Sequence, residues 1–235
     1  MAHVEAPTFG SMILAGILLK LGGVGLIRCS PLLDFSFLRS LLLAYLMVSM
    51  LYVTTVCIFQ PDLKRLIAYS SVSHMISIPI LLLANSTLSV KRAMLVILFH
   101  GLRSPILFML VGILYSLFGS RQLILLRGLI LTSPLLSFFL ILSFFFTLSA
   151  PPFPSFISEV YFFVSSFVLS SYLFYVFILF SFMSLIYNLN WLTAIVFSKS
   201  SFTPSPSMTL TYLRVLPLIT SFLLCGPLIL LIHLI

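Results

Sequence analysis

The chain has 235 residues, of which 61% are hydrophobic and only 7% are charged. Soluble domains carry about 25% charged residues, so this composition excludes an ordinary soluble protein and indicates a polytopic α-helical membrane protein. The formal net charge is +8, but the basic residues occur singly or in pairs and form no patch for nucleic acid. The three cysteines, Cys29, Cys57 and Cys225, are far apart without C-x-x-C spacing, which favours packing roles over a metal or redox centre.

Apolar runs of about 20 residues, long enough to cross a ~30 Å hydrocarbon core as a helix, recur along the chain. We expect an all-α, polytopic transmembrane helix bundle of about seven spans, one of them broken by prolines. Residues 1–235 then form one membrane-embedded unit with no soluble domain. The expected spans are Thr8–Ile27, Ser40–Phe59, Leu66–Ala84, Ala93–Phe118, the broken segment Leu129–Leu169, Ser170–Phe197 and Tyr212–Ile235.

The first span carries a lysine in its middle. Lys20 lies about twelve residues into the helix, roughly 18 Å along the axis at 1.5 Å per residue. This depth favours a functional lysine over one that extends to the membrane interface. The glycines that follow it, Gly22, Gly23 and Gly25, allow a neighbouring helix to approach closely.

The third and fourth spans each present polar residues on one helical face, at spacings of three and four residues. They are Ser70, Ser73, His74 and Ser77 on the third span, and His100, Arg103 and Ser104 on the fourth. His74 lies near the loop that ends at Arg65, so a structural histidine is the competing interpretation. Histidines on two spans also suggest a b-type haem, but such a site usually offers more candidate ligands.

The fifth segment is too long for one straight crossing and contains three prolines within residues 151–154. Proline has no backbone N–H and clashes with the preceding turn, so Pro151 and Pro152 must break the helix. A break at membrane depth frees polar backbone groups, which are tolerated only inside protein or beside a water-filled cavity. Glu159, one of four acidic residues, follows the break. An ionisable side chain in a transmembrane segment indicates a functional site.

Four titratable side chains therefore lie away from the span ends, each on a different segment: Lys20, His74, His100 and Glu159. A charge at the bilayer centre costs roughly 2.5–3.5 kcal/mol, so four such positions are costly without a use. These side chains exchange protons, and ordered water bridges longer gaps between them. We predict a proton relay. Arg103 is expected to face the hydrophilic interior and bias the charge of its neighbours, or to pair with a carboxylate such as Glu159.

Basic residues in the loops predict the orientation. Six lie on one side of the membrane and four on the other, so by the positive-inside rule the first side, with the N-terminus, faces the matrix or cytoplasm. The C-terminus is then on the opposite side. The six are Lys64, Arg65, Arg121, Arg127, Lys199 and Arg214, and the four are Arg28, Arg39, Lys91 and Arg92.

Several motifs closely resemble chain 4 of NADH–ubiquinone oxidoreductase, the respiratory complex I. They are Ala-His-Val-Glu-Ala-Pro-Thr at residues 2–8, Gly-Ser-Met at 10–12, Leu-Leu-Lys-Leu-Gly-Gly at 18–23, Asp-Leu-Lys-Arg-Leu-Ile-Ala-Tyr-Ser-Ser-Val-Ser-His-Met at 62–75, His-Gly-Leu at 100–102, and Pro151-Pro152 followed by Glu159. The motifs follow the family's order over residues 1–159, whereas the last 70 residues match only in hydropathy.

The resemblance implies a non-redox, proton-translocating subunit of the membrane arm in the mitochondrial inner membrane. Lys20 matches the family's central-axis lysine, and Glu159 matches the glutamate at the exit side of the path. His74 and His100 match the polar links between them. Family members carry no cofactor, so FMN and iron–sulfur clusters are expected on other subunits. The expected partners are other membrane-arm subunits and lipids, and no nucleic acid.

Two departures from the family matter. Family chains are about twice as long, and this chain begins where their second half begins. We predict a split subunit whose first half is a separate chain packed against the first span, and an incomplete sequence is the competing explanation. The second departure is Arg103, where the family usually has a small or uncharged residue. A secondary cation/proton antiporter subunit and a structural, non-pumping membrane-arm piece remain as alternative functions.

Overall fold

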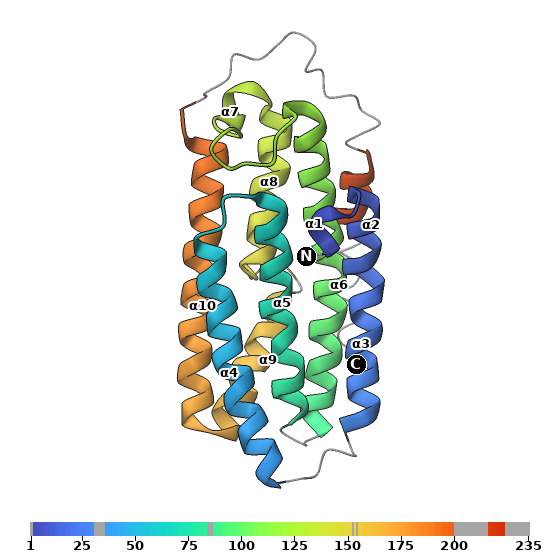
Figure 1. The fold of residues 1–235 in the computed structure, drawn as a ribbon, viewed down its shortest axis with the longest axis vertical. Helices are drawn as coiled ribbons and strands as arrows, with labels where there is room; N and C mark the ends of the chain where they lie inside the picture. The colour runs from blue at the N-terminus through green and yellow to red at the C-terminus, as the bar shows by residue number, and fades with distance from the viewer. Residues whose placement is uncertain are drawn as a thin grey trace.

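The computed structural model describes residues 2–30, 36–83, 87–151, 153, 155–199 and 216–223, which form a bundle of long helices aligned with its longest axis (Figure 1). A hydrocarbon core offers no water to backbone N–H and C=O groups, so apolar stretches satisfy them within helices. The named elements are all helical, which confirms the all-α prediction. In chain order they are α1 (Ala2–Glu5), α2 (Thr8–Ile13), the π-helical turn η1 (Leu14–Leu18), α3 (Leu19–Cys29), α4 (Ser36–Ile58), α5 (Leu63–Leu82), α6 (Thr87–Phe118), α7 (Leu129–Thr132), α8 (Pro134–Thr147), α9 (Ser155–Leu169), α10 (Ser171–Leu192) and the π-helical turn η3 (Thr193–Phe197).

Five helices in the described part of the chain are long and apolar enough to cross a membrane. They are Thr8–Cys29, Arg39–Ile58, Leu63–Leu82, Ser89–Phe118 and Ser171–Phe197. These helices correspond to the first four expected spans and the sixth. Two shorter apolar helices, Pro134–Thr147 and Ser155–Phe167, belong to the expected broken span. The expected seventh span, Tyr212–Ile235, lies outside the described residues except for 216–223, which are helical.

Some boundaries differ from the expected ones. Helix α6 begins at Thr87 instead of Ala93, because the residues before Ala93 include Lys91 and Arg92, and both are good helix formers that do not end a helix. The fifth segment has a second interruption before the predicted one, at Ser133, and α8 then starts with Pro134 at its first turn. Proline is favoured there because its missing N–H would have no helical partner anyway.

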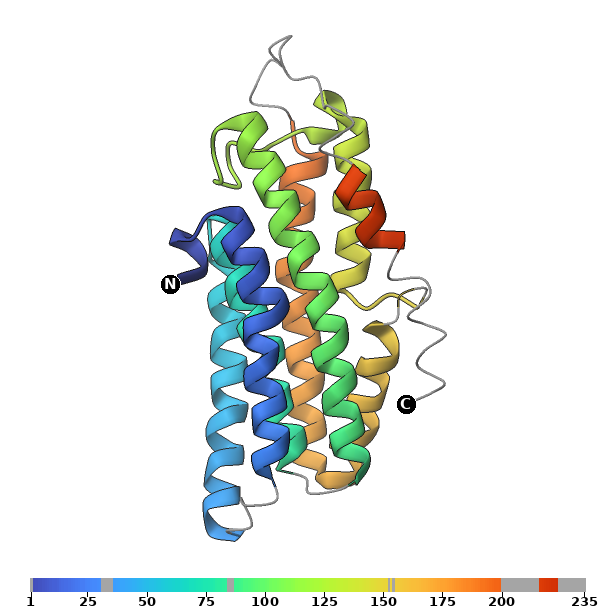
Figure 2. The ribbon, with the colours of Figure 1, turned by 90° about the vertical axis from the view of Figure 1, so that its right-hand side faces the viewer.

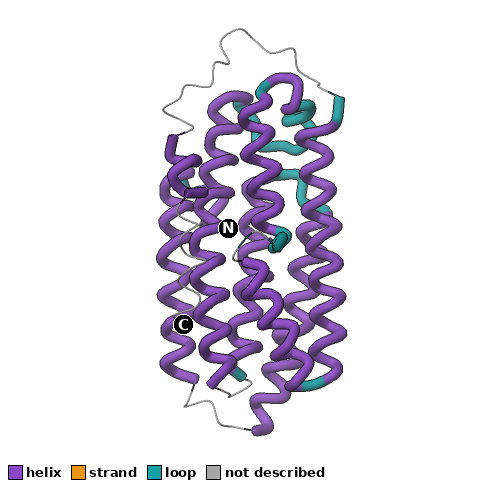
Figure 3. The backbone as a smooth tube through the Cα atoms, turned by 180° about the vertical axis from the view of Figure 1, so that it is seen from behind, coloured by secondary structure: helices purple, strands orange, loops and turns teal. Residues whose placement is uncertain are grey.

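The predicted break lies between the end of α8 and the start of α9, where the three prolines occur. Figure 2 shows the two half-helices one above the other, joined at about mid-height of the bundle, and Figure 3 shows a short loop at the same level. Some of the backbone groups near the break find partners inside the bundle. The N–H of Ala150 donates to the carbonyl of Phe145 at 3.0 Å, and Ser155 Oγ donates to the carbonyl of Phe146 at 3.1 Å.

The first span, made of α2, η1 and α3, packs closely against α6. A Cβ atom added at Gly23 would lie 2.9 Å from Cδ1 of Ile97, and one added at Gly16 would lie 3.0 Å from the proline ring of α6. Both glycines therefore allow the close approach that the sequence predicted for Gly23. Gly22 and Gly25 have no atom within 4 Å of such a Cβ, so they do not contact the described helices closely.

One end of the bundle is held together by two basic side chains. Lys64 is only 1% exposed, and its Nζ donates to the carbonyl of Ala6. Arg121 Nη1 donates to the carbonyl of Val4 at 3.4 Å, and the Arg121 carbonyl accepts from the N–H of Leu63 at 3.1 Å. The N-terminal helix and the loops before α5 and after α6 thus share one end, as the loop assignment expected. The burial of Lys64 was not predicted, because the sequence places it in a polar turn.

Candidate functional site

Lys20 lies inside the bundle, between the first span and α6. Its side chain is 9% exposed, and Nζ donates to the carbonyl of Ala15 and lies 3.4 Å from Oγ of Ser104. Ala15 belongs to the π-helical turn η1, and such wide turns are frequent at functional sites. On the α6 side, a Cβ at Gly101 would come within 3.3 Å of Cε of Lys20. The glycine therefore leaves the space through which the lysine side chain passes.

The two predicted histidines come together at the interface of α5 and α6. The ring centroids of His74 and His100 are 6.2 Å apart, and the two rings are tilted by 45°. His100 is 5% exposed, and among the described residues neither ring nitrogen has a hydrogen-bond partner at normal geometry, although the main chain of Ser71 lies beside the ring. His74 is partly buried and packs edge-on against Phe180 at 5.4 Å. Buried nitrogens without partners are rare, and a water molecule could supply the missing partner of the His100 nitrogens.

Arg103 links α6 to the broken helix. Its guanidinium is buried, and Nη1 donates to the carbonyl of Thr147 at 3.3 Å, while Nε has no partner among the described residues. Thr147 is the last residue of α8, whose final carbonyls lack helical partners and carry partial negative charge. Within the described part of the chain the ion pair found is Arg65–Asp62 at 3.3 Å. The expected alternative of direct pairing between Arg103 and Glu159 is therefore not formed, and Arg103 faces the bundle interior.

Glu159 is positioned by the break that precedes it. It lies in the second turn of α9, partly buried, and its Oε1 accepts a hydrogen bond of 2.6 Å from Oγ of Ser149. Ser149 has a left-handed backbone with φ of 52°, which is uncommon for a residue other than glycine. Such strain is maintained where the surrounding structure requires it, often at functional sites. The break therefore turns the Ser149 hydroxyl toward the carboxylate.

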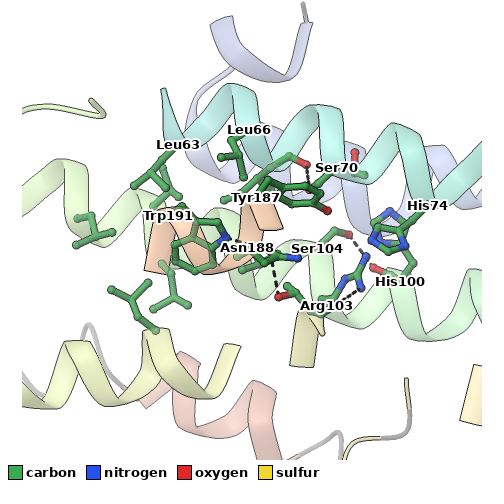
Figure 4. Close-up of a pocket in the computed structure, with 18 residues that line it drawn as sticks. Leu63, Leu66, Ser70, His74, His100, Arg103, Ser104, Tyr187, Asn188 and Trp191 are labelled. Carbon is green, nitrogen blue, oxygen red and sulfur yellow. Dashed lines mark hydrogen bonds between the residues drawn. The ribbon is translucent and has the colours of Figure 1, made fainter. Parts of the chain in front are cut away.

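Two small cavities meet at the histidines and the arginine. The first, of about 20 Å³, extends from them toward α10, where Tyr187, Asn188 and Trp191 complete its wall. Figure 4 shows these three side chains at one part of the cavity and His74, His100 and Arg103 at another. A water molecule needs roughly 10–15 Å³ of such space, so this cavity has room for one.

The second cavity, of about 40 Å³, lies on the side of the broken helix and is lined by Ser149 and Glu159. On the same criterion of roughly 10–15 Å³ per molecule it has room for a few waters. Among the described residues, three of its lining side chains also line the first cavity: His74, His100 and Arg103. The predicted titratable groups are thus arranged in sequence, with Lys20 beside Ser104, then the two histidines, and then the cavity of Glu159.

Helix α10 contributes to the site, which the sequence interpretation did not include. Asn188 is 3% exposed, and its Oδ1 accepts from Nε1 of Trp191 at 3.0 Å and lies 3.5 Å from the Thr147 hydroxyl. Its Nδ2 has no partner in the described part of the chain. The sequence feature that could have indicated this contribution was the Asn188 amide and the Tyr187 hydroxyl inside an apolar span. Their direction could not be predicted, because α10 is apolar on nearly all sides.

The serines of the polar face predicted on α5 bond to their own helix and do not form a continuous chain of hydrogen bonds. The hydroxyls of Ser70, Ser73 and Ser77 donate to carbonyls three residues earlier in their own helix, at distances of 2.9, 2.8 and 2.5 Å. Serine satisfies its hydrogen-bonding group in this way when it is buried in a helix. Ser70 lines the first cavity and Ser77 the second, so each still offers an oxygen to water there.

The described residues contain no group of three or more His, Cys, Asp and Glu side chains that could hold a metal ion. Cys29 and Cys57 are free thiols, and of the two only Cys57 is buried, so the predicted packing role is confirmed for Cys57 and not for Cys29. Cys225 lies outside the described residues.

The bundle with its broken helix has the fold of antiporter-like membrane subunits. It matches a chain of the membrane-bound sulfane sulfur reductase, an archaeal respiratory membrane complex, with a TM-score of 0.81 at 21% identity over 99% of this chain and 49% of that chain. It matches a chain of respiratory complex I from Thermus thermophilus with a TM-score of 0.76 at 21% identity, over 84% and 42% of the two chains. The Mrp complex from Dietzia gives a TM-score of 0.78 at 16% identity, over 90% and 42%. These identities show the fold alone.

Residues 1–186 match the family described as NADH:quinone oxidoreductase/Mrp antiporter, transmembrane, and the chain belongs to this family. NADH-ubiquinone oxidoreductase chain 4 of Chondrus crispus is 40% identical over 169 residues, which are 71% of this chain and 34% of the relative. The chain 4 protein of Lumbricus terrestris is 36% identical over 207 residues, 87% of this chain and 46% of the relative. The resemblance to chain 4 is confirmed. The chain spans between a third and a half of the length of these relatives.

Proposed function

We propose that this chain is a membrane-arm subunit of a proton-pumping NADH:ubiquinone oxidoreductase in the mitochondrial inner membrane, with its N-terminus on the matrix side. The proposal depends on one observation above all: His74 and His100 line both of two cavities with room for water. One cavity is lined by Ser104, whose hydroxyl lies 3.4 Å from Lys20, and the other is lined by Glu159. The eukaryotic relatives named NADH-ubiquinone oxidoreductase chain 4 support it, since they share about 40% of the aligned residues.

In this proposal a proton passes from Lys20 through water and the two histidines to Glu159 and leaves on that side. The redox energy is released in other subunits, which carry FMN and iron–sulfur clusters, and changes the charge states along the relay. This chain needs no cofactor of its own. Moving one charge across 100 mV costs about 2.3 kcal/mol, so the coupling supplies at least that amount for each proton. Arg103 contributes a fixed positive charge beside the relay.

We also propose that the first span packs against the region that corresponds to the first half of longer relatives. Most of the span's large apolar side chains, including Ile17 and Leu21, are exposed in the isolated chain. Gly22 and Gly25 lie beside open space, and small residues let membrane helices approach closely. This chain matches about half of the length of its relatives. The other half of their length is therefore the region that we expect to pack against this face of the first span. A split subunit would provide it as a separate chain.

A second candidate is a subunit of a secondary cation/proton antiporter, which the likeness to the Mrp complex from Dietzia favours. It would use the same buried groups, since the fold is shared, but without flavin and iron–sulfur partners. A structural, non-pumping membrane-arm piece is the third candidate. Four titratable side chains in the interior count against it, because each is costly in a membrane unless it is used.

Mass spectrometry of the purified native membrane complex that contains this chain tests the proposal. We expect flavin-binding and iron–sulfur subunits in the same complex, together with a chain that supplies the missing half of the family's length. A single longer polypeptide that includes this sequence would retain the function but contradict a split subunit. A complex without any flavin or iron–sulfur subunit would contradict the proposed function and favour the antiporter.

A further inference from the structure

Arg103 lies where it could control the passage of protons between the two cavities. It is 6% exposed, and with His74 and His100 it is one of the three side chains that line both cavities. It shares both cavities with the two histidines and the second cavity with Glu159, so its charge lies close to these relay groups. No carboxylate within 4 Å neutralises it among the described residues. An unpaired cation therefore lies at the junction of the predicted path.

The guanidinium is held at this junction by the broken helix. Nη1 donates to the carbonyl of Thr147 at 3.3 Å, and Thr147 is tied through its hydroxyl to Phe144 and faces Asn188 of α10. The carbonyl at the end of α8 is a good acceptor for a cation because it lies at the negative end of a helix. Nε remains without a partner in the described chain.

We propose that Arg103 is an electrostatic barrier that prevents protons from leaking between the cavity of α10 and the cavity of Glu159. A buried arginine excludes protons and other cations from narrow polar pathways in membrane proteins by the same repulsion. An excess proton on His74 or His100 is then disfavoured unless the coupled charge changes of the relay compensate for it. This role rests on the proposed function and adds to it a residue that positions charge without carrying the proton.

The test compares variants that separate charge from hydrogen bonding in the assembled complex, in sealed membrane vesicles. Arg103→Gln keeps an amide donor and removes the charge, whereas Arg103→Lys keeps the charge. We expect at least a tenfold faster decay of an imposed proton gradient with no substrate present for Arg103→Gln, and decay close to that of the unaltered complex for Arg103→Lys. Arg28→Met, which removes an exposed arginine at the end of the first span, should leave the decay unchanged.

Arg103→Ser serves as a second uncharged variant if the glutamine variant does not assemble, because serine leaves the cavity open. Faster gradient decay in either uncharged variant, together with normal decay in Arg103→Lys, supports the barrier. Gradient decay that is unchanged in the uncharged variants contradicts it. Failure of the proposed function can be told apart from failure of the barrier. If the proposed function is wrong, replacing Glu159 leaves the ratio of protons to electrons unchanged, whatever rate of gradient decay the Arg103 variants show.

Discussion

Replacement of Glu159 by glutamine is expected to stop proton translocation through this chain while electron transfer in the other subunits continues. Glutamine has nearly the same shape but cannot release a proton, and among the described residues no other carboxylate lines the cavity that it shares with His74 and Arg103. A substitute path would place a charge in the membrane interior at a cost of roughly 2.5–3.5 kcal/mol, which corresponds to a rate about 100-fold lower. The measurement is proton uptake or release per NADH oxidised in sealed vesicles.

Two further variants make the Glu159 result specific. Ser149→Ala removes the 2.6 Å hydrogen bond to the carboxylate, and hydrogen bonds to charged groups contribute about 1.5–3 kcal/mol. We therefore expect a slower step and not a complete loss. Glu5→Gln changes the other glutamate of the chain, which is exposed, and should have no effect. Equal losses in the Glu5 and Glu159 variants would contradict a specific role for Glu159.

Replacement of Gly101 by valine is expected to displace Lys20 from the interior and to reduce both assembly and proton translocation. A Cβ at Gly101 would be 3.3 Å from Cε of Lys20 and 3.6 Å from the carbonyl of Gly16, and the branched side chain adds two more carbons there. Overpacking of this kind costs about 1–3 kcal/mol. The lysine must then leave its position between Ala15 and Ser104, so transport should fall more than the amount of assembled complex does.

A graded series tests this explanation. Gly101→Ala requires a shift of only a few tenths of an ångström and should give an intermediate loss. Gly10→Ala places a Cβ at an ordinary 3.5 Å from the Pro7 ring and is the matched control at a glycine of the first span. The amount of complex and the proton-to-electron ratio would be measured in each. Normal transport in Gly101→Val would show that the space beside Lys20 is not required.

The sequence was sufficient for features that depend on local chemistry. Apolar runs of membrane-spanning length predicted the long helices, and the prolines predicted the break before Glu159, because both effects act within a few residues. The depth of Lys20 followed from counting residues along one helix. The boundary of α6 was predicted less well, because charged residues such as Lys91 are compatible with a helix and a loop alike.

Features that depend on tertiary packing could not be predicted. The acceptor of Arg103 is a backbone carbonyl 44 positions away, and a carbonyl has no sequence signature. The hydroxyl that contacts Glu159 belongs to Ser149 because of a left-handed backbone at the break, which serine rarely adopts. The contribution of Asn188 required knowing which side of an almost uniformly apolar helix faces the interior.

We propose that protons pass through the interior of this chain by way of Lys20, and this path can be tested directly. It is tested most directly by the number of protons translocated per electron pair in sealed vesicles containing the complex with Lys20→Met, a change that keeps the length of the side chain and removes its charge. We expect a lower ratio, while NADH is still oxidised by ubiquinone. An unchanged ratio in a fully assembled complex would contradict it.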